Sequence, residues 1–169
     1  MSRHNDEINR RLANLIKENY SIIYQICRVY FPYDRYKQLN LYNDIVYRVW
    51  QGLENFRGKS SERAWIYRIA INTAINHYNS DLRSLNTIRI TLDLAEFLPN
   101  EDDNQLIKQL YELIDKLNPL EKAVIFLYLD RKPQSEIGNI LGLTETNVST
   151  IIGRIKAKLK KMHDNEKQD

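Results

Sequence analysis

Residues 133–161 read PQSEIGNILGLTETNVSTIIGRIKAKLKK. Apolar residues recur in this stretch at helical spacing, yet Gly138 and Gly142 interrupt the pattern. Two short helices that cross at a steep angle need a sharp turn and a close approach, and glycine permits both. We therefore expect Gly142 to end the first helix in the left-handed conformation, and Gly138 to leave room for the second helix. The stretch predicts a helix-turn-helix.

The residues expected to fill the space between these two helices are Ile137, Leu141, Leu143, Val148 and either Ile151 or Ile152. Thr144 can cap the second helix, which should run to about Met162. In a helix-turn-helix the first residues of the second helix face base edges in the major groove. Asparagine can pair with adenine and arginine with guanine. The candidates for contact with duplex DNA are Thr144, Glu145, Thr146, Asn147, Ser149, Thr150, Arg154 and Lys156.

Two alternatives stay open for this stretch. An ordinary helical hairpin would show much of the same apolar spacing. The basic tail, which also includes Lys158, Lys160 and Lys161, supplies charge for phosphates but is equally typical of a solvated helix face.

Two further helices are predicted before the helix-turn-helix. Asn118 and Pro119 begin one of them, with Asn as N-cap, Pro at the first helical position and Glu121 three residues after the cap. That helix should end near Leu129. The earlier one is indicated by apolar residues at helical spacing, which are Leu106, Leu110, Leu113, Ile114 and Leu117. Residues 105–169 are therefore expected to form a four-helix domain.

The N-terminal part of the chain also shows helical periodicity, over Ile8–Tyr30, Gln38–Leu53 and Ser61–Asn79. Trp50 is expected to face inward with the apolar residues of the second of these helices. Three such helices can close a small core, so residues 1–80 form the second predicted domain. Residues 81–104 lose the pattern and are predicted to be an acidic flexible linker, with a short turn at 94–97. The fold class is all-α, with two small helical domains.

Composition and charge limit the function. The chain has 169 residues, of which 43% are hydrophobic and 28% charged, as expected of a folded protein. Residues 1–80 carry a net charge of +5, residues 81–130 carry −5 and residues 131–169 carry +3. Two basic ends around an acidic middle favour two surfaces for a polyanion, although ordinary solvated charge gives a similar pattern.

Several classes of function lack support in the sequence. No apolar run is long enough to span a membrane, and the N-terminus lacks a signal peptide, so we expect a cytoplasmic protein without membrane insertion. The single cysteine, Cys27, fits a reducing compartment and a place in the core. The three histidines lie far apart without acidic or cysteine ligands nearby, so no metal, other cofactor or catalytic residue is predicted.

A second basic region lies within the first predicted domain, in the loop and helix at residues 56–78, where basic residues alternate with aromatic ones. Aromatic side chains near cations can stack unpaired bases, at about 1–3 kcal/mol for each base. This composition suits single-stranded or locally opened nucleic acid. The alternative is that Trp65 and Tyr67 are core residues. His77 is expected at the surface or near DNA.

Three motifs resemble one family. Residues 54–78, ENFRGKSSERAWIYRIAINTAINHY, resemble region two of the extracytoplasmic-function sigma factors, the small initiation subunits of bacterial RNA polymerase. Residues 39–53, LNLYNDIVYRVWQGL, resemble that family's polymerase-binding helix. Residues 117–159, which include the helix-turn-helix, resemble its region four. The resemblance implies a non-enzymatic factor that directs core polymerase to promoters and opens the strands.

The resemblance also implies roles for individual residues. The helix carrying Asn43, Asp44, Tyr47, Arg48 and Trp50 would bind core polymerase. The helix-turn-helix candidates would read the minus-thirty-five element of promoter DNA as duplex. The residues implied in contacts with the minus-ten element, where the loop from Asn55 to Ser61 would hold a flipped base, are Asn55, Phe56, Arg57, Lys59, Ser60, Ser61, Arg63, Trp65, Arg68 and Asn72. An anti-sigma factor, often membrane-bound, is a further implied partner.

The sequence departs from the family at two places. Ser149 and Thr150 stand where a basic residue is common after the valine, and Asn76 and Asn79 replace an acidic residue and an arginine. The main alternative function is a two-domain helix-turn-helix regulator that binds duplex DNA without polymerase. A metal-dependent recombinase using Asp102 and Asp103, and a sigma antagonist, have less support.

Overall fold

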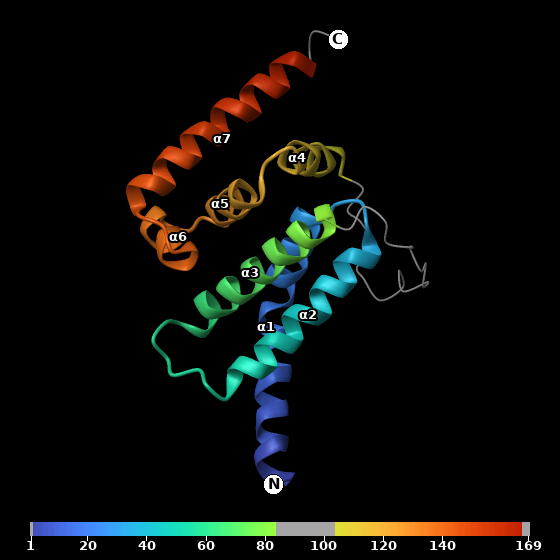
Figure 1. Ribbon diagram of the computed structural model, residues 1–169, viewed down its shortest axis with the longest axis vertical. Coiled ribbons are helices and arrows are strands. Elements are labelled where there is room, and N and C mark those ends of the chain that lie inside the picture. The colour runs from blue at the N-terminus through green and yellow to red at the C-terminus, as the bar shows by residue number, and fades with distance from the viewer. Residues whose placement is uncertain (1, 84–103, 167–169) are drawn as a thin grey trace. The chain divides into compact units, whose positions relative to one another are not determined.

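The computed structural model describes residues 2–83 and 104–166, which belong to two compact units, Met1–Pro99 and Asn100–Asp169. Every regular element in these two ranges is an α-helix, as Figure 1 shows. The prediction of an all-helical chain with two helical groups is therefore confirmed. The turn predicted at residues 94–97 lies outside the described ranges.

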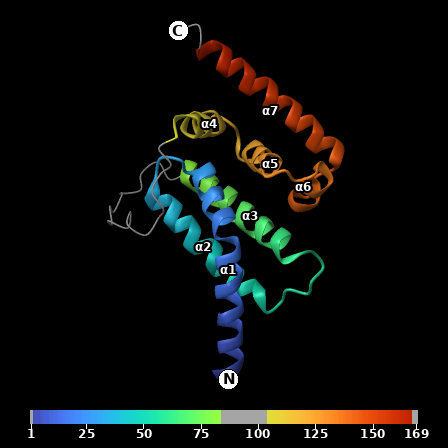
Figure 2. The same cartoon turned by 180° about the vertical axis from the view of Figure 1, so that it is seen from behind.

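The N-terminal unit contains α1 (Ser2–Tyr30), α2 (Arg35–Leu53) and α3 (Glu62–Arg83). Its core is built from the apolar stripes of these helices, for example Ile23 and Ile26 of α1, Ile45 of α2 and Ile66 of α3. The first turns of α1 project beyond the other two helices, as Figures 1 and 2 both show. All three predicted helices are present.

Three helix ends of this unit differ from the sequence prediction, and the first is the start of α1, which lies at Ser2 and not at Ile8. α2 begins at Arg35, three residues earlier than expected, because Asp34 accepts a hydrogen bond from the backbone N–H of Lys37 at 3.0 Å and caps the helix. α3 continues to Arg83, three residues into the range expected to be linker. Ser61 caps the start of α3, since its hydroxyl accepts from the N–H of Ala64 at 3.1 Å.

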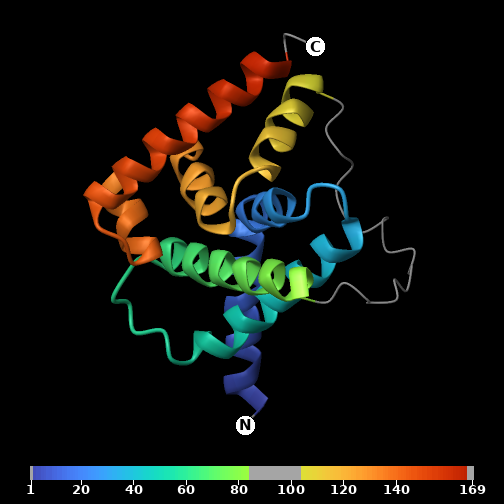
Figure 3. The ribbon, with the colours of Figure 1, turned by 45° about the horizontal axis from the view of Figure 1, so that its top comes forward.

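The C-terminal unit contains α4 (Gln105–Asp115), α5 (Pro119–Leu129), α6 (Gln134–Leu141) and α7 (Glu145–Glu166), and Figure 3 gives a clear view of them. The four predicted helices are confirmed. α5 begins with the predicted capping box, since Asn118 accepts from the N–H of Glu121 at 2.9 Å and Glu121 accepts from the N–H of Asn118 at 3.1 Å.

Helix α5 is the centre of this unit, because every residue from Glu121 to Leu127 is buried. Lys122 has no exposed surface, and its ammonium donates to the carboxylate of Asp115 at 3.0 Å. Glu121 also accepts from Lys158 of α7 at 2.6 Å. These pairs satisfy charges that would be costly to bury alone, and they join α5 to α4 and α7.

Helix α4 corrects one expectation about the core. Ile114 and Leu117 are buried as predicted, but Leu106 is 74% exposed and Leu110 is 39% exposed. The apolar spacing therefore predicted the position of the helix correctly. Of its apolar residues, only those at the C-terminal end pack into the core of the described residues.

The turn between α6 and α7 has the predicted geometry. Gly142 has a φ of +70° and caps α6 in the left-handed region. A Cβ atom on Gly138 would lie 2.5 Å from the carbonyl oxygen of Leu143, so only glycine lets the turn approach α6 this closely. The residue that comes close to Gly138 is thus Leu143, which lies in the turn, two positions before the first residue of α7.

Most of the residues that were expected to be buried around this turn are buried, but two of the predicted leucines are not. Ile137 and Val148 are fully buried, and both Ile151 and Ile152 are buried where one of them was expected. Leu141 and Leu143 are only half-buried. Ile140 is buried instead, because it lies three residues after Ile137 on the same face of α6.

Candidate nucleic-acid and polymerase interfaces

The first candidate interface is the loop between α2 and α3. Gly58 adopts a left-handed conformation with a φ of +71°, which turns the chain back toward α3. Five candidate residues present exposed or half-exposed polar side chains around this turn, and they are Asn55, Arg57, Lys59, Ser60 and Ser61. The loop therefore combines two cations with several small hydrogen-bonding groups, which suits a phosphate and the edge of a base.

One wall of this loop is aromatic. The rings of Phe56 and Trp65 lie 4.8 Å apart, and Trp65 packs on Gly52 of α2, where a Cβ atom would come within 2.8 Å of the indole. Phe56 and Trp65 are both half-buried. Trp65 therefore combines the two interpretations from the sequence, a core residue and a base-stacking residue. Its indole packs under the loop, and part of its surface stays exposed.

Helix α3 extends the candidate interface. Trp65, Arg68 and Asn72 share a face because they are spaced by three and four residues, and Arg68 and Asn72 are exposed, as is Arg63 near the start of the helix. Tyr67, by contrast, is fully buried and belongs to the core. Tyr78 is half-buried with its ring 6.2 Å from Tyr30, so neither tyrosine adds to the stacking surface.

The second candidate interface is the outer face of α2, which we call the docking face and define as Asn43, Asp44, Tyr47, Arg48 and Trp50. Trp50 was expected to face inward, but it is 43% exposed, and Tyr47 is 52% exposed with its ring 5.8 Å away. Trp50 also lines a hollow with Ile8 and Asn9 of α1. Exposed aromatic residues of this kind are enriched in protein interfaces.

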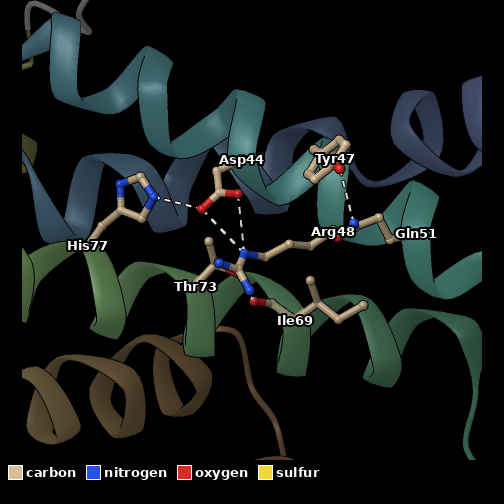
Figure 4. Close-up of polar contacts among 7 residues, drawn as sticks. All are labelled: Asp44, Tyr47, Arg48, Gln51, Ile69, Thr73 and His77. Carbon is tan, nitrogen blue, oxygen red and sulfur yellow. Dashed lines mark hydrogen bonds and ion pairs between the residues drawn. The ribbon is translucent and has the colours of Figure 1, made fainter.

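Asp44 is the polar centre of the docking face. Its carboxylate accepts from Nε of Arg48 at 3.2 Å and lies 2.8 Å from Nε2 of His77, as Figure 4 shows. Figure 4 also shows Tyr47 and Gln51 of α2 joined by a hydrogen bond, at 3.0 Å, one turn further along the helix.

His77 was expected at the surface or near DNA, and the structure shows a half-buried side chain that has a partner on another helix. It comes from α3, is half-buried and joins that helix to Asp44 of α2. This contact could not be predicted from local sequence patterns, because 33 positions separate the two residues.

The third candidate interface is the start of α7. Thr144 caps the helix by accepting from the N–H of Asn147 at 3.1 Å. The side chains of Glu145, Thr146, Asn147, Ser149, Thr150 and Arg154 are all exposed. The hydroxyl of Thr150 donates to the carbonyl of Thr146 at 3.0 Å, so its remaining capacity is as an acceptor.

Two bases of the tail of α7 have partners within the unit. Lys158 donates to Glu121 at 2.6 Å, and the ammonium of Lys156 lies 4.9 Å from the centroid of the Tyr128 ring. These two lysines therefore also have contacts within the unit, beyond the two alternatives of phosphate binding and a solvated helix face. Arg154, Lys160 and Lys161 are exposed and have no described ion pair within residues 2–83 and 104–166.

Three other kinds of feature were considered in the described residues: a metal site, a reactive cysteine and a membrane-spanning helix. In them, no group of three or more His, Cys, Asp or Glu side chains is arranged to hold a metal ion. Burial raises the pKa of the Cys27 thiol to about 12, which keeps it protonated and unreactive at neutral pH. None of the helices described here is both long and apolar enough for a membrane span.

Comparison with known proteins decides between the remaining functions. Residues 15–83 match the family model described as Sigma-70 region 2, and residues 107–159 match that described as Sigma-70, region 4. RNA polymerase sigma factor YlaC of Bacillus subtilis (strain 168) is 30% identical over 131 residues, which cover 72% of this chain and 75% of YlaC. The chain belongs to the sigma-70 family.

Other relatives agree with this assignment. RNA polymerase sigma-H factor of Pseudomonas aeruginosa is 32% identical over 87 residues, which cover 52% of this chain and 44% of that protein. The structure of CnrH in complex with the cytosolic domain of CnrY has a TM-score of 0.68 at 21% identity, over 93% of this chain and 90% of CnrH. RpoE, in complex with the anti-sigma factor NepR from Bartonella quintana, has a TM-score of 0.67 at 12% identity, over 94% of this chain and 97% of RpoE. Both structures share the fold.

The chain is thus an RNA polymerase sigma factor of the extracytoplasmic-function type, with regions 2 and 4, and it directs promoter recognition and transcription initiation. Sigma factors are not enzymes, since the polymerase carries out the chemistry. The predicted function is confirmed, and the alternative of a regulator that acts without polymerase is set aside.

Proposed function

We propose that promoter recognition is divided between residues 1–80, which bind core polymerase and the minus-ten element, and residues 105–169, which bind the minus-thirty-five element. Residues 81–104 join the two. The observation that carries this proposal is the loop between α2 and α3, where two exposed cations and small polar groups lie beside a half-buried aromatic pair. The start of α7, by contrast, is polar and lacks such a pair.

In this proposal the loop between α2 and α3 holds a base flipped out of the minus-ten element. Extracting a base costs a few kcal/mol of stacking and pairing, which the loop offsets only for the base that its polar groups fit. Arg63, Arg68 and Asn72 contact the adjoining single strand, and Arg57 and Lys59 bind its phosphates. The result is strand opening that begins at the captured base.

The docking face of α2 binds core polymerase. Its centre is charged and its outer residues are aromatic. Aromatic residues are enriched in protein interfaces, and charged groups fix how the two partners are placed against each other. α2 and α3 share the His77–Asp44 contact, so the surface for polymerase and the surface for DNA are parts of one rigid bundle.

The start of α7 reads the minus-thirty-five element in the major groove. Asn147 is the strongest candidate for a base contact, since an exposed amide can form two hydrogen bonds to adenine. Thr144, Glu145, Thr146, Ser149 and Thr150 complete the surface, and Arg154 and Lys156 add charge for phosphates.

We further propose a cytoplasmic location and control by an anti-sigma factor. Of two proteins with this fold, RpoE has been seen bound to the anti-sigma factor NepR, and CnrH to the cytosolic domain of CnrY. A partner that covers the docking face would compete with polymerase for the same aromatic residues.

Substituting Asn147 by alanine is expected to weaken recognition of one upstream base by about 10-fold, the value of a good amide–adenine pair. Transcription from a promoter library randomised at the minus-thirty-five element would show relaxed preference at a single position. Asn165→Ala, the same change in the last turn of α7, should leave every position unchanged. Equal profiles for Asn147→Ala and the natural protein would contradict the assignment.

Substituting Lys59 by alanine is expected to slow strand opening by about 5- to 10-fold, because the loop loses one of its two cations. Permanganate footprinting of thymines in the opened region would follow the rate on linear promoter DNA. Lys17→Ala, which removes an exposed charge from α1, provides the matched control. An opening rate that is the same for both variants would refute the role of the loop.

The experiment that tests the function as a whole is run-off transcription with core polymerase from the same organism. Specific initiation on genomic promoters should require this chain. Tight binding to a palindrome by the chain alone, without stimulation of transcription, would contradict the proposal.

A further inference from the structure

Arg11 of α1 contacts both ends of the loop between α2 and α3. Its guanidinium lies 2.5 Å from the carboxylate of Glu62, the first residue of α3. The same guanidinium lies 6.0 Å from the centroid of the Phe56 ring, at the start of the loop. Arg11 is therefore a link between a third helix and the segment that we assign to base capture.

The middle of this loop has little else to hold it. Asn55 and Phe56 donate backbone hydrogen bonds to the end of α2, and Ser61 caps α3. None of the hydrogen bonds given for the described residues involves positions 57–60, and a Cβ atom on Gly58 would meet nothing within 4 Å. The loop thus depends on contacts at its two ends, and Arg11 reaches both of them.

Arg11 lies just before the stretch that the region 2 family model matches. The match to region 2 begins at residue 15, four positions after Arg11. The first turns of α1 project from the bundle on the side of the loop, as Figure 1 shows. The contact therefore joins the N-terminal part of α1 to the two ends of the loop.

We propose that Arg11 is a positioning residue that holds the loop ready for the flipped base. A loop ordered before it meets DNA loses less conformational entropy on binding than a loose one. The proposal rests on the base-capturing function assigned to the loop, and it adds that α1 determines how well the loop is ordered.

The first test uses the full chain without DNA. Arg57 and Lys59 are trypsin sites within the loop, and cleavage there reports how often the loop opens. We expect Arg11→Glu and Glu62→Arg to speed cleavage at these two bonds by about 5-fold, because each puts like charges together. The double variant, which exchanges the two charges, should restore the natural rate.

Arg10→Glu is the matched control, since it makes the same charge change one position earlier on α1. Among the residues that the structure describes, Arg10 has no ion pair, and its substitution should leave cleavage of the loop unchanged. Unchanged cleavage in Arg11→Glu, or failure of the charge exchange to restore it, would overturn the proposal.

The second test uses holoenzyme and a promoter with 2-aminopurine at the captured position, whose fluorescence rises when the base leaves the stack. Arg11→Glu should reduce the rate of the rise by about 5-fold and the charge exchange should restore it, whereas a direct contact of Arg11 with DNA would not be restored. If Lys59→Ala has no effect here while cleavage still responds to Arg11, the base-capturing function fails and the positioning of the loop stands.

Discussion

Gly138→Ala is expected to destabilise the C-terminal unit by roughly 2–3 kcal/mol, since overpacking at a rigid contact costs this much. The new methyl group would lie 2.5 Å from the carbonyl oxygen of Leu143. Backbone cannot move aside as a flexible side chain can, so the turn must open. Opening also strains the hydrogen bond from the N–H of Leu143 to the carbonyl of Gly138, now 2.9 Å long.

Amide hydrogen exchange in the full chain measures this effect where it occurs. Slowly exchanging amides of α5 and of the buried face of α7 should exchange about 30- to 150-fold faster, which is the stated free energy as a ratio. Trp50 and Trp65 both belong to the N-terminal unit, so the tryptophan fluorescence of urea unfolding should stay unchanged.

Gly153→Ala provides the matched control for this substitution. Gly153 lies in the middle of α7, is exposed, and a Cβ atom there would meet nothing within 4 Å. Alanine should therefore stabilise the helix by about 0.5–1 kcal/mol. If Gly138→Ala were also neutral or stabilising, the close approach at Gly138 would not be what specifies glycine.

The last three helices, α5 to α7, could be predicted from the sequence because their constraints are local. Gly142 needs a left-handed backbone and Asn118 needs a donor three residues later, and both requirements show within a few positions of sequence. Trp50 and Leu106 could not be placed in the same way. Helical periodicity gives the face on which a residue lies, but not whether another element covers that face.

The candidate site was predictable to the same extent. Exposed residues of the loop and of α7 followed from their polarity and position. The partners of His77 and Lys158 did not, since Asp44 and Glu121 come from elements more than thirty positions away. Tyr67 could not be assigned from the sequence, because a tyrosine in the core and a tyrosine that stacks on bases look the same there. The two differ only in burial, and Tyr67 is fully buried.

Asp44→Arg is expected to weaken binding to core polymerase by about 100-fold, in line with losses of 2–5 kcal/mol when a partly buried charged pair at an interface is broken. The carboxylate now pairs with Arg48 and lies 2.8 Å from Nε2 of His77, and its side chain is only 28% exposed. Arginine in its place would put two guanidinium groups beside an imidazole. Arg48 would then leave its position, and the centre of the docking face would change sign.

Titration of fluorescently labelled core polymerase at a fixed salt concentration measures this affinity. Asp81→Arg is the control, because it breaks the pair of Asp81 with Lys37, 2.7 Å apart, which also joins α3 to α2 but lies near the first turn of α2. Paired charges with similar exposure contribute about 0–1 kcal/mol to folding, so the two variants should have similar stability. Only Asp44→Arg should show a reduced affinity for core polymerase.

His77→Gln then separates the two roles of Asp44. Glutamine keeps a donor for the carboxylate, so a docking face that needs only a neutral partner for Asp44 retains most of its affinity. A loss close to that of Asp44→Arg would mean that the position of the carboxylate, set from α3, determines docking. If Asp44→Arg and Asp81→Arg weakened polymerase binding equally, the docking face would lie elsewhere on the bundle, and Trp50 and Tyr47 would need another partner.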